Sequence, residues 1–369
     1  MEQVRGRQTG VTLLLICSVA LLFLVGLLMV FNTTSAEILD RNLKASIHGP
    51  FLKQLIYGSL GIVFGIFAYR IGYERLVKYS PYLLFGIGVI LVALFIPGIG
   101  QTINGSRRWF GFMGFSFQPS ECVKILLPMA YIQWFTSQKE KVNFKGFCKI
   151  VTLLFIPIGL ILVQPDHGTT LILLSLLTVL FFLTRIRFSY WALPLCVLLS
   201  VGAWGAYQIP YVKSRIEIYL HPELDLKGKG HQPHQAKIAA GSGKLFGRGL
   251  GESLQKLNYL PEARSDYIAA IYAEEGGFIG VLGLIAVYLI FTFSGIAIAM
   301  RSYDPKGFYL SAILTFSISI QAFLNLGIVS GLLPSKGTTL PFFSQGGSSL
   351  LINLIGFFLL LDIGRKQRA

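Results

Sequence analysis

Charge is scarce in this chain of 369 residues: 13% of it is charged, about half the share in an ordinary soluble domain, whereas 53% is apolar. Acidic residues are the scarcer sign, with 17 Asp and Glu against 32 Lys and Arg. The shortage of charge excludes a soluble globular protein, and with it nucleic-acid binding as the explanation of the basic excess. An integral membrane protein, which collects Lys and Arg in its cytoplasmic loops, accounts for both features.

Cysteine is also scarce. The four cysteines lie in or beside apolar segments without CxxC spacing, which indicates neither a disulfide framework nor a zinc site: Cys17, Cys122, Cys148 and Cys196. The pair His231 and His234 lacks the spacing and the third acidic ligand of a metal site. No metal ligand can be assigned from the sequence.

Long apolar runs are abundant. A helix needs about 20 apolar residues to cross ~30 Å of hydrocarbon, and ten stretches qualify or nearly qualify. They predict an all-α, polytopic membrane protein with one domain over residues 1–369. The ten transmembrane helices are expected near 11–31, 54–70, 81–97, 121–136, 149–164, 169–184, 190–208, 267–300, 307–329 and 345–364.

Basic residues predict the orientation. An even number of spans puts both termini on one side; with the termini inside, sixteen Lys and Arg lie in inner segments and six in short outer loops. Nine more lie in one long outer connection between spans seven and eight, about residues 209–266. Long loops cross the membrane largely regardless of their charge, so only the short loops are compared. Sixteen basic residues in the inner segments against six in the short outer loops place both termini in the cytoplasm. The first span has 21 residues, longer than a signal-peptide core, and is expected to remain as an anchor.

The long outer connection is the first candidate for a functional region, because structureless loops beyond about 15 residues are uncommon unless they are functional. Its glycines do not make a nucleotide site. Gly241-Ser-Gly-Lys244 lacks the spacing of a phosphate-binding loop, and Gly247-x-Gly-x-Gly251 lacks the strand and helix of a dinucleotide site.

Carboxylates near membrane depth are informative, because a charge buried there is costly and usually faces a cavity, pairs or acts. Asp362 is expected to form an interfacial ion pair with Arg365 and Lys366. Glu121 and Lys124 lie three residues apart on one helical face, which favours a buried pair.

Two aspartates lie in connections. Asp166 stands in the turn Gln164-Pro-Asp-His-Gly168, where capping of the turn is expected. Asp266 differs, because it lies at the outer mouth where the long connection meets a span.

Basic residues also gather in the outer loops. Arg107 and Arg108 follow Asn104-Gly105, and Lys336-Gly337 precedes Gly346-Gly347. Outer Lys and Arg do not help insertion, and glycines let backbone N–H groups approach a ligand closely. The pattern favours a site for phosphate or diphosphate on a lipid carrier, and the nine basic residues of the long connection are interpreted in the same way.

Seven motifs occur in one order, and together they resemble the SEDS family (shape, elongation, division and sporulation) over roughly residues 15–364. The motifs are Asn104-Gly-Ser-Arg-Arg-Trp109, Gln118-Pro-Ser-Glu121 with Lys124, Gln164-Pro-Asp-His-Gly168, Gly241-Ser-Gly through Gly247-Arg-Gly-Leu-Gly251, Leu260-Pro-Glu-Ala-Arg-Ser-Asp266, Glu274-Glu275, and Leu333-Pro-Ser-Lys-Gly337 with Gly346-Gly-Ser-Ser349.

Within the family, Lys336 of Leu-Pro-Ser-Lys-Gly resembles the division branch, FtsW, more than the elongation branch, RodA. The chain departs from the family pattern where Arg264 replaces the usual His, Gln345 the usual Tyr, and Lys237 a hydrophobic residue. None of these changes removes Asp266.

The resemblance implies a bacterial glycosyltransferase that polymerises lipid II into peptidoglycan at the outer face of the cytoplasmic membrane, at the division site. It implies Asp266 as the general base, acting on the acceptor hydroxyl. Undecaprenyl diphosphate is the leaving group, which cationic side chains stabilise, and a divalent cation such as Mg²⁺ or Mn²⁺ is compatible with the same role. The expected substrate-binding positions are Arg108, Lys124, Arg215 and Lys336, with Glu121, Asp166, Gln232, Gln235 and Glu262 lining the cavity.

The same resemblance implies a class B penicillin-binding protein, a transpeptidase, as partner, together with other division proteins. Two other functions stay open on the sequence. A lipid II flippase would have as many spans, but it should line a path through the bilayer with polar groups, whereas the candidate residues here concentrate on the outer side. A non-enzymatic division scaffold would leave the polar outer motifs unexplained.

Overall fold

The computed structural model describes most of the chain. The described residues are 2–41, 48–103, 106–112, 114–192, 230–256, 260, 263–334 and 337–366, with 196, 200, 207, 208, 217 and 219 as isolated positions. The predicted seventh span, 190–208, falls mostly outside them, as do most of residues 209–229.

Helices account for most of the described chain. Seven of those described are long and apolar enough to cross a membrane: α1 (Glu2–Arg41), α2 (Gly49–Ile71), α3 (Tyr73–Ala93), α5 (Phe144–Val163), α10 (Ile268–Met300), α11 (Pro305–Val329) and α12 (Gly347–Lys366). Two further helices, α4 (Pro119–Ser137) and the shorter apolar α6 (His167–Leu183), coincide with predicted spans. The helical, polytopic architecture is therefore confirmed.

Helix ends follow from local sequence. Asn143 and Asp304 cap α5 and α11, because their side-chain oxygens accept from the N–H groups of Gly146 at 2.7 Å and Gly307 at 3.2 Å. A side-chain cap satisfies one of the N–H groups that the first helical turn leaves free. Helix α2 ends at Gly72, whose φ of 90° turns the chain directly into α3.

A small sheet corrects the all-α expectation. Strands β1 (Gly100–Ile103), β2 (Ser106–Phe112) and β3 (Phe115–Phe117) form an antiparallel sheet in the order β1-β2-β3, with Phe110 paired to Phe117. The aromatic residues of Arg-Trp-Phe-Gly-Phe suit strands, and Gly98 and Gly114, with φ of 91° and 81°, provide the turns beside them. The three strands are short and lie in a connection between predicted spans, so the sequence predicted only a loop here.

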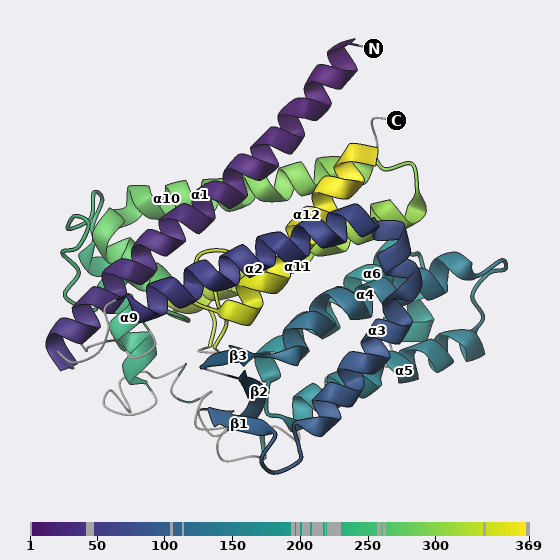
Figure 1. The fold of residues 1–369 in the computed structure, drawn as a ribbon, viewed down its shortest axis with the longest axis horizontal. Helices are drawn as coiled ribbons and strands as arrows, with labels where there is room; N and C mark the ends of the chain where they lie inside the picture. The colour runs from purple at the N-terminus through teal and green to yellow at the C-terminus, as the bar shows by residue number, and fades with distance from the viewer. Residues whose placement is uncertain are drawn as a thin grey trace.

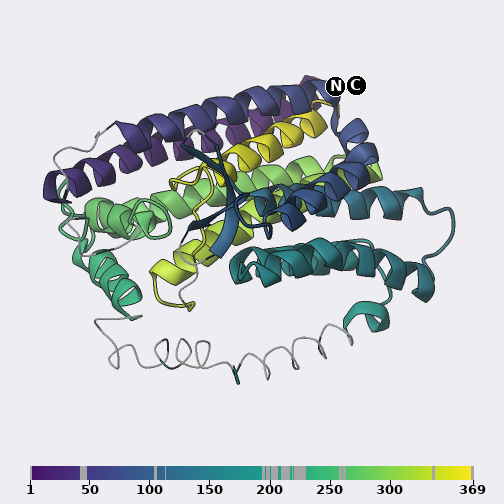
Figure 2. The same cartoon turned by 60° about the horizontal axis from the view of Figure 1, so that its bottom comes forward.

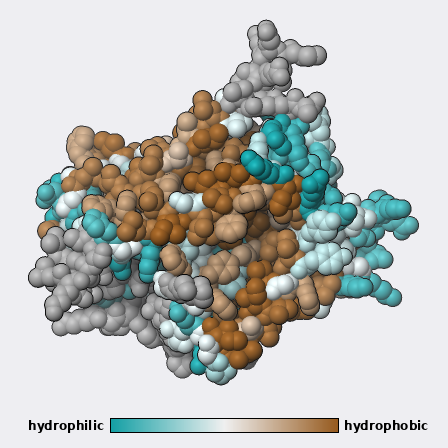
Figure 3. Space-filling model, viewed as in Figure 1, coloured by the Kyte–Doolittle hydropathy of each residue, from teal (hydrophilic) through white to brown (hydrophobic). Residues whose placement is uncertain are grey.

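The long connection also contains regular structure. Helix α9 (His231–Ser242) lies in it and packs against α10 and α11. In Figure 1, α1 passes obliquely across α10 and α2 packs against α12, and both chain ends lie at the same end of the bundle, as Figure 2 also shows. Figure 3 shows apolar side chains across the middle of this face and hydrophilic ones towards its ends, as expected for a protein surrounded by lipid.

The end of the bundle that holds both termini is fastened by Asp362. Its carboxylate, fully buried, accepts from the backbone N–H of Tyr73 at 2.9 Å and pairs with Arg365 at 3.2 Å and Lys366 at 3.4 Å. The predicted ion pair is confirmed, and Lys366 also reaches Glu74. The network joins the end of α12 to the turn between α2 and α3.

Helices α2 and α12 pack closely because α2 presents glycines to its neighbours. A methyl group at Gly61 would lie 2.7 Å from Leu354, and one at Gly65 would lie 2.2 Å from the ring of Phe358. Small residues at such an interface allow helices in a membrane to approach.

We expect Gly65→Leu to lower the thermal unfolding temperature in detergent, because overpacking costs about 1–3 kcal/mol. Gly86→Leu is the matched control, since Gly86 of α3 has no heavy atom within 4 Å of an added methyl group. Equal unfolding temperatures for the two variants would contradict the tight α2–α12 contact.

Candidate functional site

Residues 337–340, the junction segment, lie where two sequence motifs meet. A methyl group added to Gly337 would lie 2.8 Å from Oδ2 of Asp266, so the carboxylate of Asp266 rests against this glycine. A methyl group added to Gly168 would lie 3.5 Å from the carbonyl oxygen of Gly337. The turn that holds Asp166 and the residue predicted as the base therefore both contact the junction segment.

The backbone of Asp266 is held from α11. The side-chain amide of Asn325, 1% exposed, donates to the carbonyl of Asp266 at 2.9 Å and to that of Thr338 at 2.6 Å. Two residues earlier, the carbonyl of Arg264 accepts from the N–H of Gln345 at 3.0 Å. Hydrogen bonds from two other parts of the chain thus fix the peptide that carries Asp266, while its side chain is half-buried.

Glu121 and Lys124 form the predicted buried pair on α4. The Lys124 Nζ lies 2.6 Å from Oε2 of Glu121, an ion pair without hydrogen-bond geometry, and donates to Oε1 of Gln321 at 2.9 Å. The amide of Gln321 in turn donates to the carbonyl of Thr339 at 3.0 Å, and the Thr339 hydroxyl donates to Ser349 at 3.1 Å. The ion pair is therefore connected to the junction segment.

Asp166 caps α6, as predicted. Its Oδ1 accepts from the backbone N–H of Thr169 at 3.1 Å, and its Oδ2 accepts from the side-chain amide of Gln118 at 2.9 Å. Arg108 of β2 places a guanidinium nitrogen 3.5 Å from Oδ1. The sheet thus carries a partly exposed cation to a buried carboxylate.

Several of the described helices begin at the end of the bundle where the junction segment lies. Helices α4, α6, α10 and α12 start at Pro119, His167, Ile268 and Gly347, and α4 is tied to α12 because the N–H of Gln118 donates to the Ser348 hydroxyl at 2.9 Å. Helix N-termini carry partial positive charge. They add partial positive charge at the end of the bundle where Lys124 pairs with Glu121 and Arg108 with Asp166.

The structure brings five of the predicted residues around the junction segment: Arg108, Glu121, Lys124, Asp166 and Asp266. Gln232 and Gln235 lie half-buried on α9, a separate helix that packs against α10 and α11. Arg215, Glu262 and Lys336 lie outside the described residues, although Gly337, next to Lys336, contacts Asp266.

Sequence reasoning missed Gln321 and Asn325. They lie four residues apart on α11 and so share a face of an otherwise apolar helix, which was the available signal. In the part of the chain that the structure describes, no group of three or more His, Cys, Asp or Glu side chains lies close enough together to hold a metal ion.

Comparison with known proteins identifies relatives along almost the whole chain. Residues 12–369 match the family FTSW_RODA_SPOVE, described as cell cycle proteins. The chain is 39% identical over 361 residues to a probable peptidoglycan glycosyltransferase FtsW of Coxiella burnetii, covering 95% of each chain. It is 37% identical over 321 residues to one of Geobacter metallireducens (86% of each) and 36% identical over 366 residues to stage V sporulation protein E of Bacillus subtilis (98% and 99%).

Solved structures share the fold. A chain of a peptidoglycan synthase complex, described for its structural coordination of polymerization and crosslinking, superposes with a TM-score of 0.75 at 24% identity, covering 97% of both chains. The rod shape determining protein RodA of Thermus thermophilus superposes with a TM-score of 0.70 at 24% identity, covering 96% of this chain and 97% of that one.

We expect Asn325→Leu to lower the unfolding temperature, because two buried carbonyls lose their donor and each unsatisfied group costs about 1–3 kcal/mol. Asn353→Leu on α12 is the control, since the Asn353 amide donates only a long bond of 3.4 Å to Ser349. Thermal unfolding in detergent compares the two. An Asn325 variant as stable as the Asn353 variant would show that the anchoring contributes nothing.

Proposed function

The chain belongs to the FtsW/RodA/SpoVE family, and from this membership we propose that it is a peptidoglycan glycosyltransferase that polymerises lipid II, with Asp266 as its general base. The observation that carries the proposal is the position of Asp266. Its carboxylate lies at the junction segment, around which two separate cation-bearing clusters also gather.

The reaction joins two lipid-linked disaccharides. The 4-hydroxyl of N-acetylglucosamine on the acceptor gives up its proton and attacks C1 of N-acetylmuramic acid on the donor. The new glycosidic bond forms as the bond to undecaprenyl diphosphate breaks, so the diphosphate leaves with the electron pair. Because the donor linkage is α and the product linkage is β, a single displacement with inversion is sufficient and no covalent enzyme intermediate is needed.

Asp266 takes the proton of the acceptor hydroxyl. A general base must come within about 2.6–3.2 Å of that proton's oxygen, which requires a carboxylate held in place on a partly open surface. Asp266 is half-buried, its own carbonyl is held by Asn325, and Gly337 leaves room beside it.

Lys124 and Arg108 are proposed contacts of the diphosphate. Each already faces a carboxylate, Lys124 that of Glu121 and Arg108 that of Asp166. These carboxylates hold the cations in place in the absence of substrate, and the bound diphosphate would share them. Arg215 and Lys336 are proposed as further contacts of the diphosphate, and Gln232, Gln235 and Glu262 are proposed to line the substrate-binding cavity.

The site is proposed to face the outside of the cytoplasmic membrane, where lipid II is polymerised, with both termini in the cytoplasm. The excess of basic residues in the predicted inner segments supports this orientation. The relatives named FtsW support a role in division, and the fold shared with a chain of a peptidoglycan synthase complex is compatible with a class B transpeptidase as partner.

We expect Asp266→Asn to abolish glycan strand synthesis, because an amide cannot accept the proton and loss of a general base costs about 10²–10⁴-fold. The protein, purified with its transpeptidase, is given labelled lipid II and the strands are resolved on a gel. Asp304→Asn, which alters a cap at the other end of α11, should lower stability but leave strand synthesis intact. Unchanged synthesis by the Asp266 variant would show that another group is the base.

We expect Lys336→Ala to lower turnover more than it lowers the unfolding temperature, because a cation near the leaving diphosphate is lost. The same gel assay measures turnover, and thermal unfolding measures stability. Lys53→Ala serves as the control for a basic residue of another predicted outer loop. A turnover equal to that of the control would show that Lys336 is a solvated surface charge without a role in the reaction.

A further inference from the structure

Helix α10 is broken at Gly277. This residue has φ of 64° and ψ of −168°, a conformation that glycine adopts and other residues avoid. The break separates a short piece, residues 268–276, from the longer apolar piece that follows. Asp266 lies two residues before this half-helix, and Glu274 and Glu275 lie at its other end.

A loop from the long connection fills the break. The N–H groups of Arg248 and Gly249 donate to the carbonyls of Glu274 and Glu275 at 3.0 and 3.1 Å. On the far side, the N–H groups of Phe278 and Ile279 donate to the carbonyls of Lys244 and Leu245 at 2.9 and 3.2 Å. The loop therefore satisfies two carbonyls of the first piece and two N–H groups of the second, and an apolar environment requires such partners.

Close approach requires glycine on both sides of this contact. A methyl group at Gly247 would lie 2.0 Å from the carbonyl oxygen of Glu275, and one at Gly277 would lie 2.2 Å from the N of Gly247. Because the two pieces of α10 are separated, the axis of the longer piece does not fix the half-helix. Its position depends on what holds its two ends.

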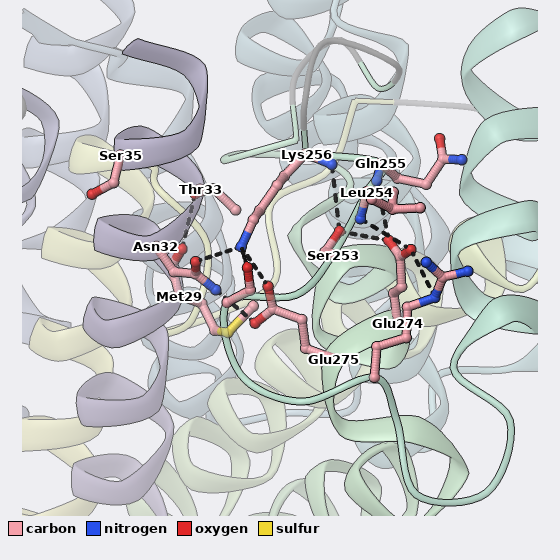
Figure 4. A network of polar contacts seen from close by, with 12 residues as sticks. Met29, Asn32, Thr33, Ser35, Ser253, Leu254, Gln255, Lys256, Glu274 and Glu275 are labelled. Atoms are coloured by element: carbon pink, nitrogen blue, oxygen red, sulfur yellow. Dashed lines mark hydrogen bonds and ion pairs between the residues drawn. The ribbon is translucent and has the colours of Figure 1, made fainter. Parts of the chain in front are cut away.

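Glu274 holds the half-helix to the segment that follows the loop. Its carboxylate, 1% exposed, accepts from the Ser253 hydroxyl at 2.5 Å and from the N–H groups of Leu254 and Gln255 at 3.2 and 3.3 Å. Arg248 lies 3.6 Å away. Figure 4 shows Ser253, Leu254 and Gln255 grouped around the carboxylate of Glu274.

Glu275 holds the half-helix to α1. Its Oε1 pairs with Nζ of Lys256 at 2.9 Å, and its Oε2 accepts from the side-chain amide of Asn32 at 2.6 Å. Lys256 completes the triangle by donating to Oδ1 of Asn32 at 2.8 Å and also donates to the carbonyl of Gly251 at 2.5 Å. All three N–H donors of the ammonium are thereby used, and Figure 4 shows Lys256 reaching between α1 and α10.

A buried ion pair contributes little net stability compared with apolar residues of the same volume, because desolvation offsets the attraction. What distinguishes the pair is its geometric specificity. The contacts among Lys256, Glu275 and Asn32 form together only when α1, the loop and the half-helix keep this relative position. The half-helix is short, with a rise of about 1.5 Å per residue. A displacement of its Glu275 end therefore also displaces the end beside Asp266.

We propose that Lys256 and Glu275 are positioning residues for Asp266, which they place by fixing the far end of the half-helix while Asn325 fixes the near end. The inference rests on the proposed function of Asp266 as the base. It assigns to the Lys256–Glu275–Asn32 triangle an effect on the rate of the reaction that goes beyond holding the fold together.

The experiment uses Lys256→Met, Glu275→Gln and the double variant in the full-length protein with its transpeptidase. Each single variant should lower kcat at least about tenfold with KM nearly unchanged, because a small displacement of a catalytic group is costly. The double variant leaves no unpaired charge and should regain most of the unfolding temperature, yet kcat should stay low. Recovery of kcat together with stability would overturn the proposal.

Asp362→Asn is the matched control, since it also neutralises a buried, ion-paired carboxylate, at the other end of the bundle. It should lower the unfolding temperature without lowering kcat of the folded protein. A loss of kcat equal to that in the double variant would reduce the role of the triangle to general stability.

Amide hydrogen exchange separates this inference from the proposed function. In the double variant, exchange should rise in residues 264–276 and stay unchanged in 280–298, whether or not the protein polymerises lipid II. Absence of synthesis by the unaltered protein would refute the proposed function alone. Unchanged exchange in residues 264–276 would refute the positioning role alone.

Discussion

Every ionic or backbone polar group inside an apolar bundle needs a partner, since neither water nor lipid supplies one, and the arrangement at the site follows from this requirement. Glu121 is met by Lys124, Asp166 by Gln118 and Arg108, and Glu275 by Lys256 and Asn32. These partners come from segments far apart in the sequence. The polar contacts therefore bring the loops and helix ends to fixed positions around Asp266.

The apolar runs were enough to predict the long apolar helices that the structure describes, because length and hydrophobicity are local properties. They did not predict α9, which lies in the long connection. Ion pairs between residues three or four apart, such as Glu121 with Lys124 and Asp362 with Arg365, were also predictable from helical spacing. The sheet that carries Arg108 was not, because its strands are short and lie in a polar connection. The contact between Asp266 and Gly337 depends on how α10 and α11 pack, which no local pattern encodes.

The basic residues of the long connection do not all have the same role. The sequence suggested that all nine serve an anionic substrate, but Lys256 is 8% exposed and is paired with Glu275. Arg248 lies near Glu274 as well. At least these two cations neutralise carboxylates of the protein itself. Counting charges by predicted side of the membrane could not reveal this, because Glu274 and Glu275 were assigned to a span and their partners to a loop.

The break at Gly277 also divides the length of α10 into two unequal pieces. Unbroken, α10 with its 33 residues would extend about 50 Å, well beyond the ~30 Å of hydrocarbon that a membrane offers. The piece after the break is long enough to span that core by itself, so the half-helix is not needed for the crossing. One helical turn rises about 5.4 Å, so the position of a single glycine in the sequence sets the length of the half-helix, and with it the distance between Asp266 and the apolar piece of α10.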